Sequence, residues 1–377
     1  MPAVPYHLDK FPPPSLDWPR LVPLLGPTAA AIARFDGTLA VIPNAAVLLA
    51  PLMTHEAVLS SRIEGTQATM GEVLQFRAGD EQSALSAERR HDIHEVLNYQ
   101  RAMVEAAKQL DELPLCWRVL RQTHRVLLDG ARGHGKDPGE FRKIPNWIGP
   151  AGCTIDQARF IPIGVEHLTA AASRWESFLH EDFADRLLQL AILHAEFEAL
   201  HPFLDGNGRL GRLIIPLWMW RQGIIRQPIF YMSAWLEAHR DDYYERLLAV
   251  SRDDDWTGWC AFFLGGLRAQ AEENEAKAKA IVALHASLRH KVSDWTRSAQ
   301  AIKAVDWIFA TPYFYAPTFV AQSGIADQTA RRILNVLRDK GLLTTVVAGR
   351  GRRPGLYMFS ALVDIAEGRP VDLDSHG

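Results

Sequence analysis

Cysteine is scarce in this chain of 377 residues, which has three, at Cys116, Cys153 and Cys260. They lie far apart, form no CxxC pair and leave one over, which is against a disulfide framework. This usage of cysteine indicates a reducing compartment.

Long apolar runs are also missing, because no uninterrupted stretch approaches the length needed to span a membrane. The N-terminal segment MPAVPYHLDKFPPP lacks the basic start and the apolar run of a secretory signal. We therefore expect a cytoplasmic protein with no membrane partner.

Net charge is small, at −3, and by itself hardly constrains the partners. Hydrophobic residues make up 48% and charged residues 23% of the chain, which is ordinary for a soluble globular protein. No internal repeat is visible. The length allows two or three domains.

Most of the chain has helical periodicity. Residues up to about Arg34 are rich in proline and are expected to run as an extended arm. Helices are predicted at about 42–65, 87–110, from 114, 166–179, 183–200, 210–223, 233–248 and 255–290. Segment 144–163 has β-branched and aromatic runs around a Gly-Pro-Ala-Gly turn, which predicts a hairpin.

The most informative segment is HPFLDGNGRLGR, residues 201–212. The glycines of its GNG turn leave backbone N–H groups unobstructed, and a helix starting near Asn207 would direct its positive dipole end to the same place. Arg209 and Arg212 are three residues apart, so on a helix they share a face and could bind successive phosphates. Asp205 lies at the edge of the loop, where a carboxylate beside phosphates is suited to hold magnesium. The pattern predicts a polyphosphate site beside a base.

In these residues the chain resembles the Fic family of nucleotidyl transferases, whose signature HPFx(D/E)GNGRxxR is matched at every specified position. The resemblance implies that His201 deprotonates the hydroxyl of a Ser, Thr or Tyr side chain on a target protein. That oxygen attacks the α-phosphate of ATP, so AMP stays on the target and pyrophosphate departs. Self-modification follows the same chemistry. The resemblance assigns Asp205 to Mg²⁺, and the ATP phosphates to Gly206, Asn207, Gly208, Arg209, Leu210, Gly211 and Arg212.

Alternatives remain beside this interpretation. A zinc site formed by His194 and His201 would need a third ligand that the sequence does not offer at suitable spacing, so His194 is expected in the core. UTP could replace ATP, because the signature binds phosphates and not the base. Doc-type kinases have lysine at the place of Gly208, which is against simple phosphate transfer. The sequence leaves the oligomeric state open, a homodimer included.

A second motif is SSRIEG, residues 60–65, which is similar to the inhibitory motif (S/T)xxxE(G/N) of Fic proteins with an N-terminal regulatory helix. Ser60 and Glu64 are four residues apart and therefore neighbours on one helix face. The resemblance implies that Glu64 pairs with Arg212 and removes it from the γ-phosphate. The motif also allows the reverse activity, removal of AMP from a modified protein, in which Glu64 would orient the attacking water.

Two further groups surround the expected site. The hairpin at 144–163 resembles the Fic flap, which pairs with the target segment as an added strand through Asn146, Trp147, Ile148 and Gly149. The segment EAHRDDYY places His239, Tyr243 and Tyr244 as candidate contacts to adenosine.

The amino-acid composition and the periodicity of hydrophobic residues change from about Ser298. Three helix-like segments are followed by a predicted pair of strands with a basic tip, a pattern typical of a winged helix-turn-helix. Between Arg297 and Arg353 nine basic residues face three acidic ones, which gives +6 (9 − 3). Such a surface can bind DNA or serve protein contacts. The candidate DNA contacts are Gln328, Thr329, Arg331, Arg332, Arg350, Arg352 and Arg353.

The fold class expected from these features is mainly α. We predict a regulatory region at 1–110 and a Fic-type helical core with a small hairpin flap at 111–290. A winged helix-turn-helix domain is predicted at 291–377. A DNA-binding regulator with a nucleotide-sensing core is the competing function.

Overall fold

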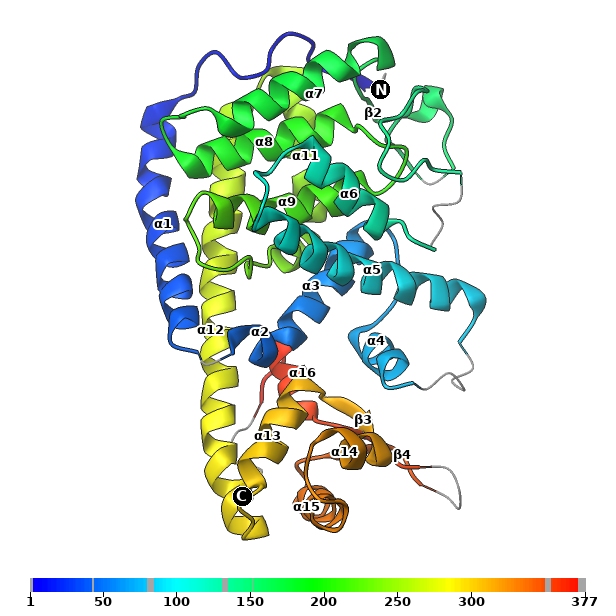
Figure 1. Cartoon of the computed structure of the whole chain (residues 1–377). Helices are drawn as coiled ribbons and strands as arrows, with labels where there is room; N and C mark the ends of the chain where they lie inside the picture. Colours follow the sequence, from blue (N-terminus) through cyan, green and yellow to red (C-terminus); the bar gives the residue numbers. More distant parts are fainter. Residues whose placement is uncertain are drawn as a thin grey trace. The chain divides into compact units, whose positions relative to one another are not determined.

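The computed structural model describes residues 3–42, 44–79, 85–130, 135–150, 152–349 and 354–371. It is mainly helical, as expected, and divides into two compact units (Figure 1). Unit 1 comprises residues 1–36, 59–67 and 87–272, and unit 2 comprises residues 37–58, 68–86 and 273–377. These units cut across the three ranges predicted from the sequence, because single long helices contribute residues to both.

Unit 1 contains the helices on which the signature lies. Its helices are α5 (Ala87–Leu110), α6 (Trp117–Leu127), α7 (Val165–His180), α8 (Arg186–Leu200), α9 (Asn207–Arg221), α10 (Ser233–Ala238) and α11 (Arg240–Asp253). Helices α1 (Trp18–Ala40), α3 (Ala50–Ile63) and α12 (Trp256–Thr296) are shared between the units. The predicted helix at 233–248 is thus two helices, which meet at His239.

The core of unit 1 forms around α8 and α9. Asp185 caps α8 by accepting hydrogen bonds from the backbone N–H groups of Leu187 and Leu188 at 2.8 and 3.0 Å. Every side chain of α8 from Leu187 to Phe197 is buried, and α9 is buried from Leu210 to Met219. Helices that are buried on all sides lie in the centre of a domain. The loop between them, which carries the first half of the signature, is therefore held at both ends by rigid elements.

The expectation of an extended arm up to Arg34 is wrong, because α1 begins at Trp18 despite Pro23 and Pro27 within it. Leu21, Thr28 and Phe35 recur at heptad spacing and are all buried. Thr28 Oγ1 lies 3.3 Å from the Leu264 carbonyl of α12, and the two helices lie side by side in Figure 1. Burial of this face stabilises a helix that proline would otherwise interrupt.

Residues before α1 form the short strand β1 (Val4–Pro5), which pairs in parallel with β2 (Phe160–Ile161). The predicted hairpin at 144–163 is correspondingly reduced, since its two sides are joined by one bridge between Ile148 and Phe160. Strand β1 of the N-terminal segment pairs with β2 on the edge opposite Ile148. The second side of the predicted hairpin therefore pairs mainly with the N-terminal segment and not with the first side. This pairing between distant segments has no signal in the local sequence.

Unit 2 contains α2 (Ala45–Leu48), α4 (Met70–Arg77), α13 (Ala301–Ala310), α14 (Ala316–Gln322), α15 (Asp327–Asp339) and α16 (Ser360–Ala366). Strands β3 (Tyr313–Tyr315), β4 (Thr344–Val347) and β5 (Leu356–Met358) form an antiparallel sheet of order β3-β5-β4. The sequence prediction missed β3, α4 and α16. Helix α4 has a recognisable start, since Thr69 and Glu72 form a capping box.

Within the described ranges, no helix is both long and apolar enough to cross a membrane.

Candidate active site

His201 ends α8 with a left-handed backbone conformation, φ 45° and ψ 59°. Its carbonyl accepts a hydrogen bond from Nε of Arg142 at 2.9 Å and lies 3.5 Å from Nδ2 of Asn146. The backbone N–H of Arg142 donates to the Pro202 carbonyl at 2.9 Å. Arg142 also donates to the carbonyls of Ile163 and Leu200. One buried guanidinium therefore fixes the turn that presents the imidazole, a role that no motif in the sequence indicated.

The imidazole of His201 is in the chemical state that a base requires. Burial lowers the pKa of His201 to about 4, so the ring is neutral near neutral pH. Its Nδ1 is buried away from solvent, and a hydrogen bond with the Glu198 backbone partly opposes the lowering of the pKa. A neutral ring can accept a proton at its other nitrogen, Nε2, from a hydroxyl placed beside it.

Asn207 shapes the loop that follows. Its Oδ1 accepts from the Phe203 backbone N–H at 2.9 Å, and its Nδ2 donates to the Phe203 carbonyl at 2.8 Å. Both ends of the buried amide are therefore occupied by the loop itself. An anion hole at this place would use the backbone N–H of Asn207 and not its side chain.

The start of α9 has the properties of an anion site. Gly206 occupies the cap position with φ 76°, in the left-handed region that favours glycine, and provides no side-chain cap. The N–H groups of the first helical turn point away from the helix and carry its partial positive charge. Leu210 and Gly211, which the sequence assigned to the phosphates, are buried; a Cβ on Gly211 would lie 2.4 Å from Glu198 Oε1.

His124 of α6 contacts the loop between α8 and α9. The Gly139 backbone N–H donates to its Nδ1 at 2.8 Å, so Nε2 carries the proton and donates to the Asp205 carbonyl at 2.8 Å. The ring stacks on Phe203 with centroids 3.9 Å apart. Burial lowers the pKa of His124 to about 4. The sequence gave no signal for this role, because His124 lies 81 residues from Asp205.

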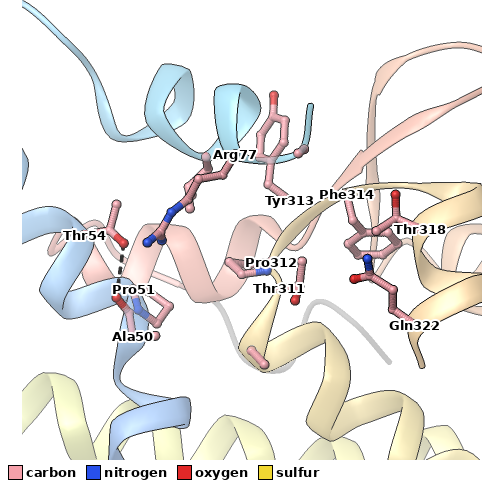
Figure 2. A pocket seen from close by; sticks show the side chains of 13 residues that line it. Ala50, Pro51, Thr54, Arg77, Thr311, Pro312, Tyr313, Phe314, Thr318 and Gln322 are labelled. Carbon is pink, nitrogen blue, oxygen red and sulfur yellow. Dashed lines mark hydrogen bonds between the residues drawn. The ribbon is translucent and has the colours of Figure 1, made fainter. Parts of the chain in front are cut away.

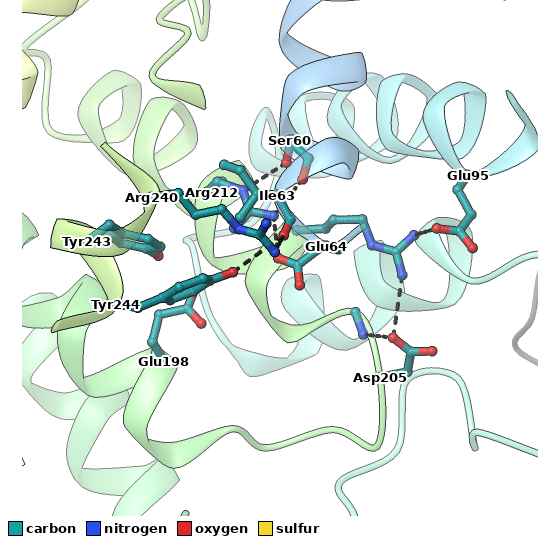
Figure 3. Close-up of polar contacts among 12 residues, drawn as sticks. Ser60, Ile63, Glu64, Glu95, Glu198, Asp205, Arg212, Arg240, Tyr243 and Tyr244 are labelled. Atoms are coloured by element: carbon teal, nitrogen blue, oxygen red, sulfur yellow. Dashed lines mark hydrogen bonds and ion pairs between the residues drawn. The ribbon is translucent and has the colours of Figure 1, made fainter. Parts of the chain in front are cut away.

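Arg212 is enclosed by the Ser60–Glu64 segment (Figure 3). Its Nη2 donates to Glu64 Oε1 at 2.6 Å and to the Ser60 carbonyl at 2.8 Å, and its Nε donates to Ser60 Oγ at 2.9 Å. The Arg212 side chain is 2% exposed, whereas that of Glu64 is 35% exposed. Burial opposes ionisation of Glu64, but the charge and the hydrogen bond of Arg212 hold the pKa of Glu64 below its usual range. The two groups form a charged pair at the mouth of the site.

Gly208 makes this pair sterically feasible. A Cβ at this position would lie 2.2 Å from Glu64 Oε1 and 3.1 Å from Arg212 Nη1. Any side chain here would displace the Glu64 carboxylate. The glycine therefore serves the contact between Glu64 and Arg212 as well as the anion site.

Arg209 is held by other carboxylates. Its Nη1 donates to Glu95 Oε2 at 2.9 Å, and its Nη2 lies 3.5 Å from Asp205 Oδ1. Glu95 and Arg209 are both buried. Arg209 thus contributes positive charge to the loop, but its guanidinium is committed to acidic partners.

Asp205 has the donor chemistry for a magnesium ion. Its side chain is 36% exposed, and its Oδ1 accepts from the Gly206 backbone N–H at 2.6 Å. No group of three potential metal ligands exists within the described residues. A single exposed carboxylate fits Mg²⁺, which binds few protein ligands and takes the rest from phosphates and water.

Residues 22–108 match the family described as Fic/DOC family N-terminal, and residues 114–219 match the Fic/DOC family. The chain carries Fic/DOC family domains. Over 141 residues it is 30% identical to the "Protein adenylyltransferase Fic" of Culex quinquefasciatus, a match that covers 36% of this chain and 24% of that protein. The chain thus spans about a quarter of the curated relative's length.

Solved structures with the Fic fold resemble the chain more extensively. A Fic family protein from Desulfovibrio desulfuricans G20 superposes with a TM-score of 0.60 at 21% identity, covering 92% of this chain and 98% of that one. A Fic domain containing signaling protein from Bacteroides thetaiotaomicron VPI-5482 gives 0.55 at 18% identity, covering 68% and 97%. At sequence identities of 21% and 18%, these similarities show a common fold and nothing further.

The candidate flap residues, 146–149, begin beside the loop that follows His201. Asn146 Nδ2 donates to the Phe203 carbonyl at 3.2 Å, so this residue fastens the flap to the loop. Trp147 is 41% exposed and donates from Nε1 to the Cys153 carbonyl at 2.9 Å. Ile148 forms the bridge to Phe160, and Gly149 lies exposed beyond it. The backbone N–H and carbonyl of Ile148 are thus already paired with residues 159 and 160.

The three candidate adenosine contacts have different positions. Tyr243 is 1% exposed, and its hydroxyl lies 2.9 Å from His194 Nε2 in the core. His194 is therefore the core histidine that the sequence led us to expect. Tyr244 is partly exposed, with its hydroxyl 3.4 Å from the Ile63 carbonyl, and His239 is exposed and stacks on Trp235. The geometry leaves Tyr244 and His239 as the accessible members of the group.

Glu198 is a further buried acid that sequence reasoning passed over. Burial raises the pKa of Glu198 to about 7, although the nearby charge of Arg212 opposes the shift. Its carboxyl lies 3.9 Å from His194 Nε2. Glu198 therefore carries a proton part of the time near neutral pH, which limits the negative charge around Arg212.

Proposed function

We propose that this protein transfers AMP from ATP to a hydroxyl of a target protein and that Glu64 restrains the transfer. One observation carries the proposal: the Arg212 side chain is bound by Ser60 and Glu64 directly beside the uncapped start of α9. An arginine of the phosphate site bound by a carboxylate is unavailable to a phosphate. The relatives named protein adenylyltransferase support the reaction type.

In the proposed reaction, the neutral imidazole of His201 takes the proton of the target hydroxyl as its oxygen attacks the α-phosphorus of ATP. The bond from that phosphorus to the bridging oxygen breaks, and pyrophosphate leaves with the electron pair. The backbone N–H groups at the start of α9 stabilise the charge on the phosphate oxygens. Asp205 would hold Mg²⁺, which when bound neutralises phosphate charge.

Restraint follows from competition for Arg212. In the productive arrangement this guanidinium would bind the γ-phosphate, but the Glu64 carboxylate occupies it. Charged hydrogen bonds contribute about 1.5 to 3 kcal/mol, which corresponds to roughly ten- to a hundredfold in binding. Displacement of Glu64 would uncover the part of the guanidinium that the carboxylate occupies, while the two hydrogen bonds of Arg212 to Ser60 would remain.

The target segment would add as a strand along the flap. Strand addition uses backbone hydrogen bonds and therefore tolerates varied sequences. Residues 146–149 would take this role, because Asn146 ties the flap to the loop of His201 and Trp147 is exposed. The added strand would bring one hydroxyl to the imidazole.

Mass spectrometry of the full chain incubated with ATP, and separately with UTP, tests the proposal. The Glu64→Gly variant should acquire the mass of AMP, on itself or on an added target, in preference to UMP. Absence of any nucleotide adduct in this variant refutes the transfer. In parallel, AMP-modified target is incubated with wild type and Glu64→Gly. Release of AMP that requires Glu64 would assign the reverse reaction instead.

We propose DNA binding as a second function of the C-terminal part. The order of the C-terminal elements and their three-stranded sheet support a winged helix. This order is α13, β3, α14, α15, β4 and β5. Arg331 is exposed on α15, whereas Arg332 donates to the Thr296 carbonyl at 2.8 Å. Arg350, Arg352 and Arg353 lie outside the described residues. Salt-dependent binding to a duplex, lost when these three arginines are replaced together, would support this function; no binding at low salt would exclude it.

A further inference from the structure

Unit 2 contains a cavity of about 300 Å³ that is distant in sequence from the signature (Figure 2). Three segments form its walls: the start of α3, the end of α4, and the chain from α13 through β3 to α14. The lining residues are Ala50, Pro51, Thr54, Leu74, Arg77, Ala78, Ala310, Thr311, Pro312, Tyr313, Phe314, Thr318 and Gln322. The volume is at the lower end of the range for small-molecule sites.

Arg77 gives this cavity its chemical character. Arg77 lines the cavity and is exposed as a residue, although burial lowers the pKa of its guanidinium, and none of the lining residues carries a carboxylate. No ion pair or hydrogen bond joins the Arg77 guanidinium to another of the described residues. A guanidinium has five donors in a fixed planar fork that matches a carboxylate or a phosphate.

The rest of the lining suits an apolar body. Pro51, Leu74, Pro312 and Phe314 are buried and contribute apolar surface. Thr318 and Gln322 of α14 add polar groups on one side. Thr54 directs its hydroxyl to the Ala50 carbonyl at 3.2 Å, so its proton is already used within α3.

We propose that this cavity binds a small organic anion whose acidic group pairs with Arg77 and whose apolar part packs against Phe314 and Pro312. A mainly apolar lining with a single convergent charge is the usual composition of such a site. A carboxylate and a phosphate share the required chemistry, and the experiment below separates them.

Benzoate, phenyl phosphate and benzamide are the probes, each titrated into the full-length protein by calorimetry. Benzamide has the shape of benzoate without its charge. Wild type should bind benzoate or phenyl phosphate at least about tenfold more tightly than benzamide, as a charged hydrogen bond predicts. The stronger of the two anions identifies the acidic group. Equal binding of benzoate, phenyl phosphate and benzamide, or no binding of any of them, overturns the proposal.

Variants at Arg77 make the test specific. Arg77→Met should lose the preference for the anion, and Arg77→Lys should keep part of it because the charge remains. Arg289→Met is the matched control, since Arg289 is exposed on α12 in the same unit and does not line the cavity. If Arg77→Met, folded as judged by circular dichroism, binds the anion as wild type does, the site is refuted.

Helix α3 both lines the cavity and contributes to the contact that restrains Arg212. A coupling between the two sites is expected if the proposed function holds. Helix α3 supplies Pro51 and Thr54 to the cavity and Ser60 to the Arg212 contact. A ligand that favours one position of α3 would therefore change ATP affinity, and the two binding events would be reciprocal.

Calorimetry of ATP binding with and without saturating anion measures this coupling. We expect a change of about fivefold or more in the Kd for ATP in wild type, and none in Glu64→Gly. An unchanged Kd in wild type refutes the coupling. Failure of AMP transfer would leave the anion titrations unaffected, so the two proposals fail separately.

Discussion

Arg212 Nη2 lies 2.6 Å from Glu64 Oε1, across 148 residues of sequence. The contact joins the single carboxylate of the SSRIEG motif to the last arginine of the signature, and Ser60 completes it with two further oxygen atoms. Residues 60–65 belong to unit 1, together with α8 and α9.

Glu64→Gly should raise nucleotide labelling about tenfold to a hundredfold, because Arg212 is then available to the γ-phosphate. Initial rates with labelled ATP measure the gain. Glu112→Gly is the control, as Glu112 is an exposed glutamate in a turn. No gain in Glu64→Gly would reject the restraint.

His201→Ala should lower labelling by about two to four orders of magnitude when introduced together with Glu64→Gly, which is the usual contribution of a general base. His91→Ala, at an exposed position on α5, should leave the rate unchanged. Retention of the rate without His201 would exclude this residue as the base.

Arg142→Lys should reduce kcat about tenfold or more while the KM for ATP changes little. Lysine keeps the charge but cannot supply the hydrogen bonds that Arg142 makes to the carbonyls of Leu200 and His201. Steady-state kinetics in the Glu64→Gly background separate the two parameters. The neighbouring exposed Lys143 provides the control substitution Lys143→Ala. A rise in KM alone would assign Arg142 to ATP binding and not to positioning.

His124→Asn should destabilise the protein near pH 7, and this loss should shrink as the pH falls. In the folded protein the pKa of His124 is about 4, below its ordinary value of 6.5. As the pH falls from 6.5 to 4, the unfolded wild type binds a proton at this histidine that the folded protein does not bind, so His124 lowers the stability of the wild type. The variant has no histidine at this position and does not show this loss. At pH 5 the difference in unfolding free energy between wild type and variant should be about 2 kcal/mol smaller than at pH 7. Urea unfolding at both pH values measures it. A difference independent of pH would mean that His124 titrates normally in the folded protein.

Some of the active site could be predicted from the sequence because its parts are contiguous. Residues 201–212 are joined by one short loop, so their chemistry could be recognised together, and α9 begins at Asn207 as the dipole argument required. Helix α5 likewise has the predicted bounds, since a long amphipathic pattern is a strong local signal. By contrast, α1 was missed because burial of one face outweighs the local effect of its prolines.

The sequence by itself determined the chemical groups available at the signature and the pairing partner proposed for Arg212. Only the tertiary structure decided that Arg142 and His124 position the loop, that Glu95 holds Arg209, and that Tyr243 lies in the core. The physical reason is that hydrogen bonds and burial depend on distance in space. Packing of α5, α6 and α8 brings together groups that are far apart along the chain. Such contacts produce no local pattern in the sequence from which they could be predicted.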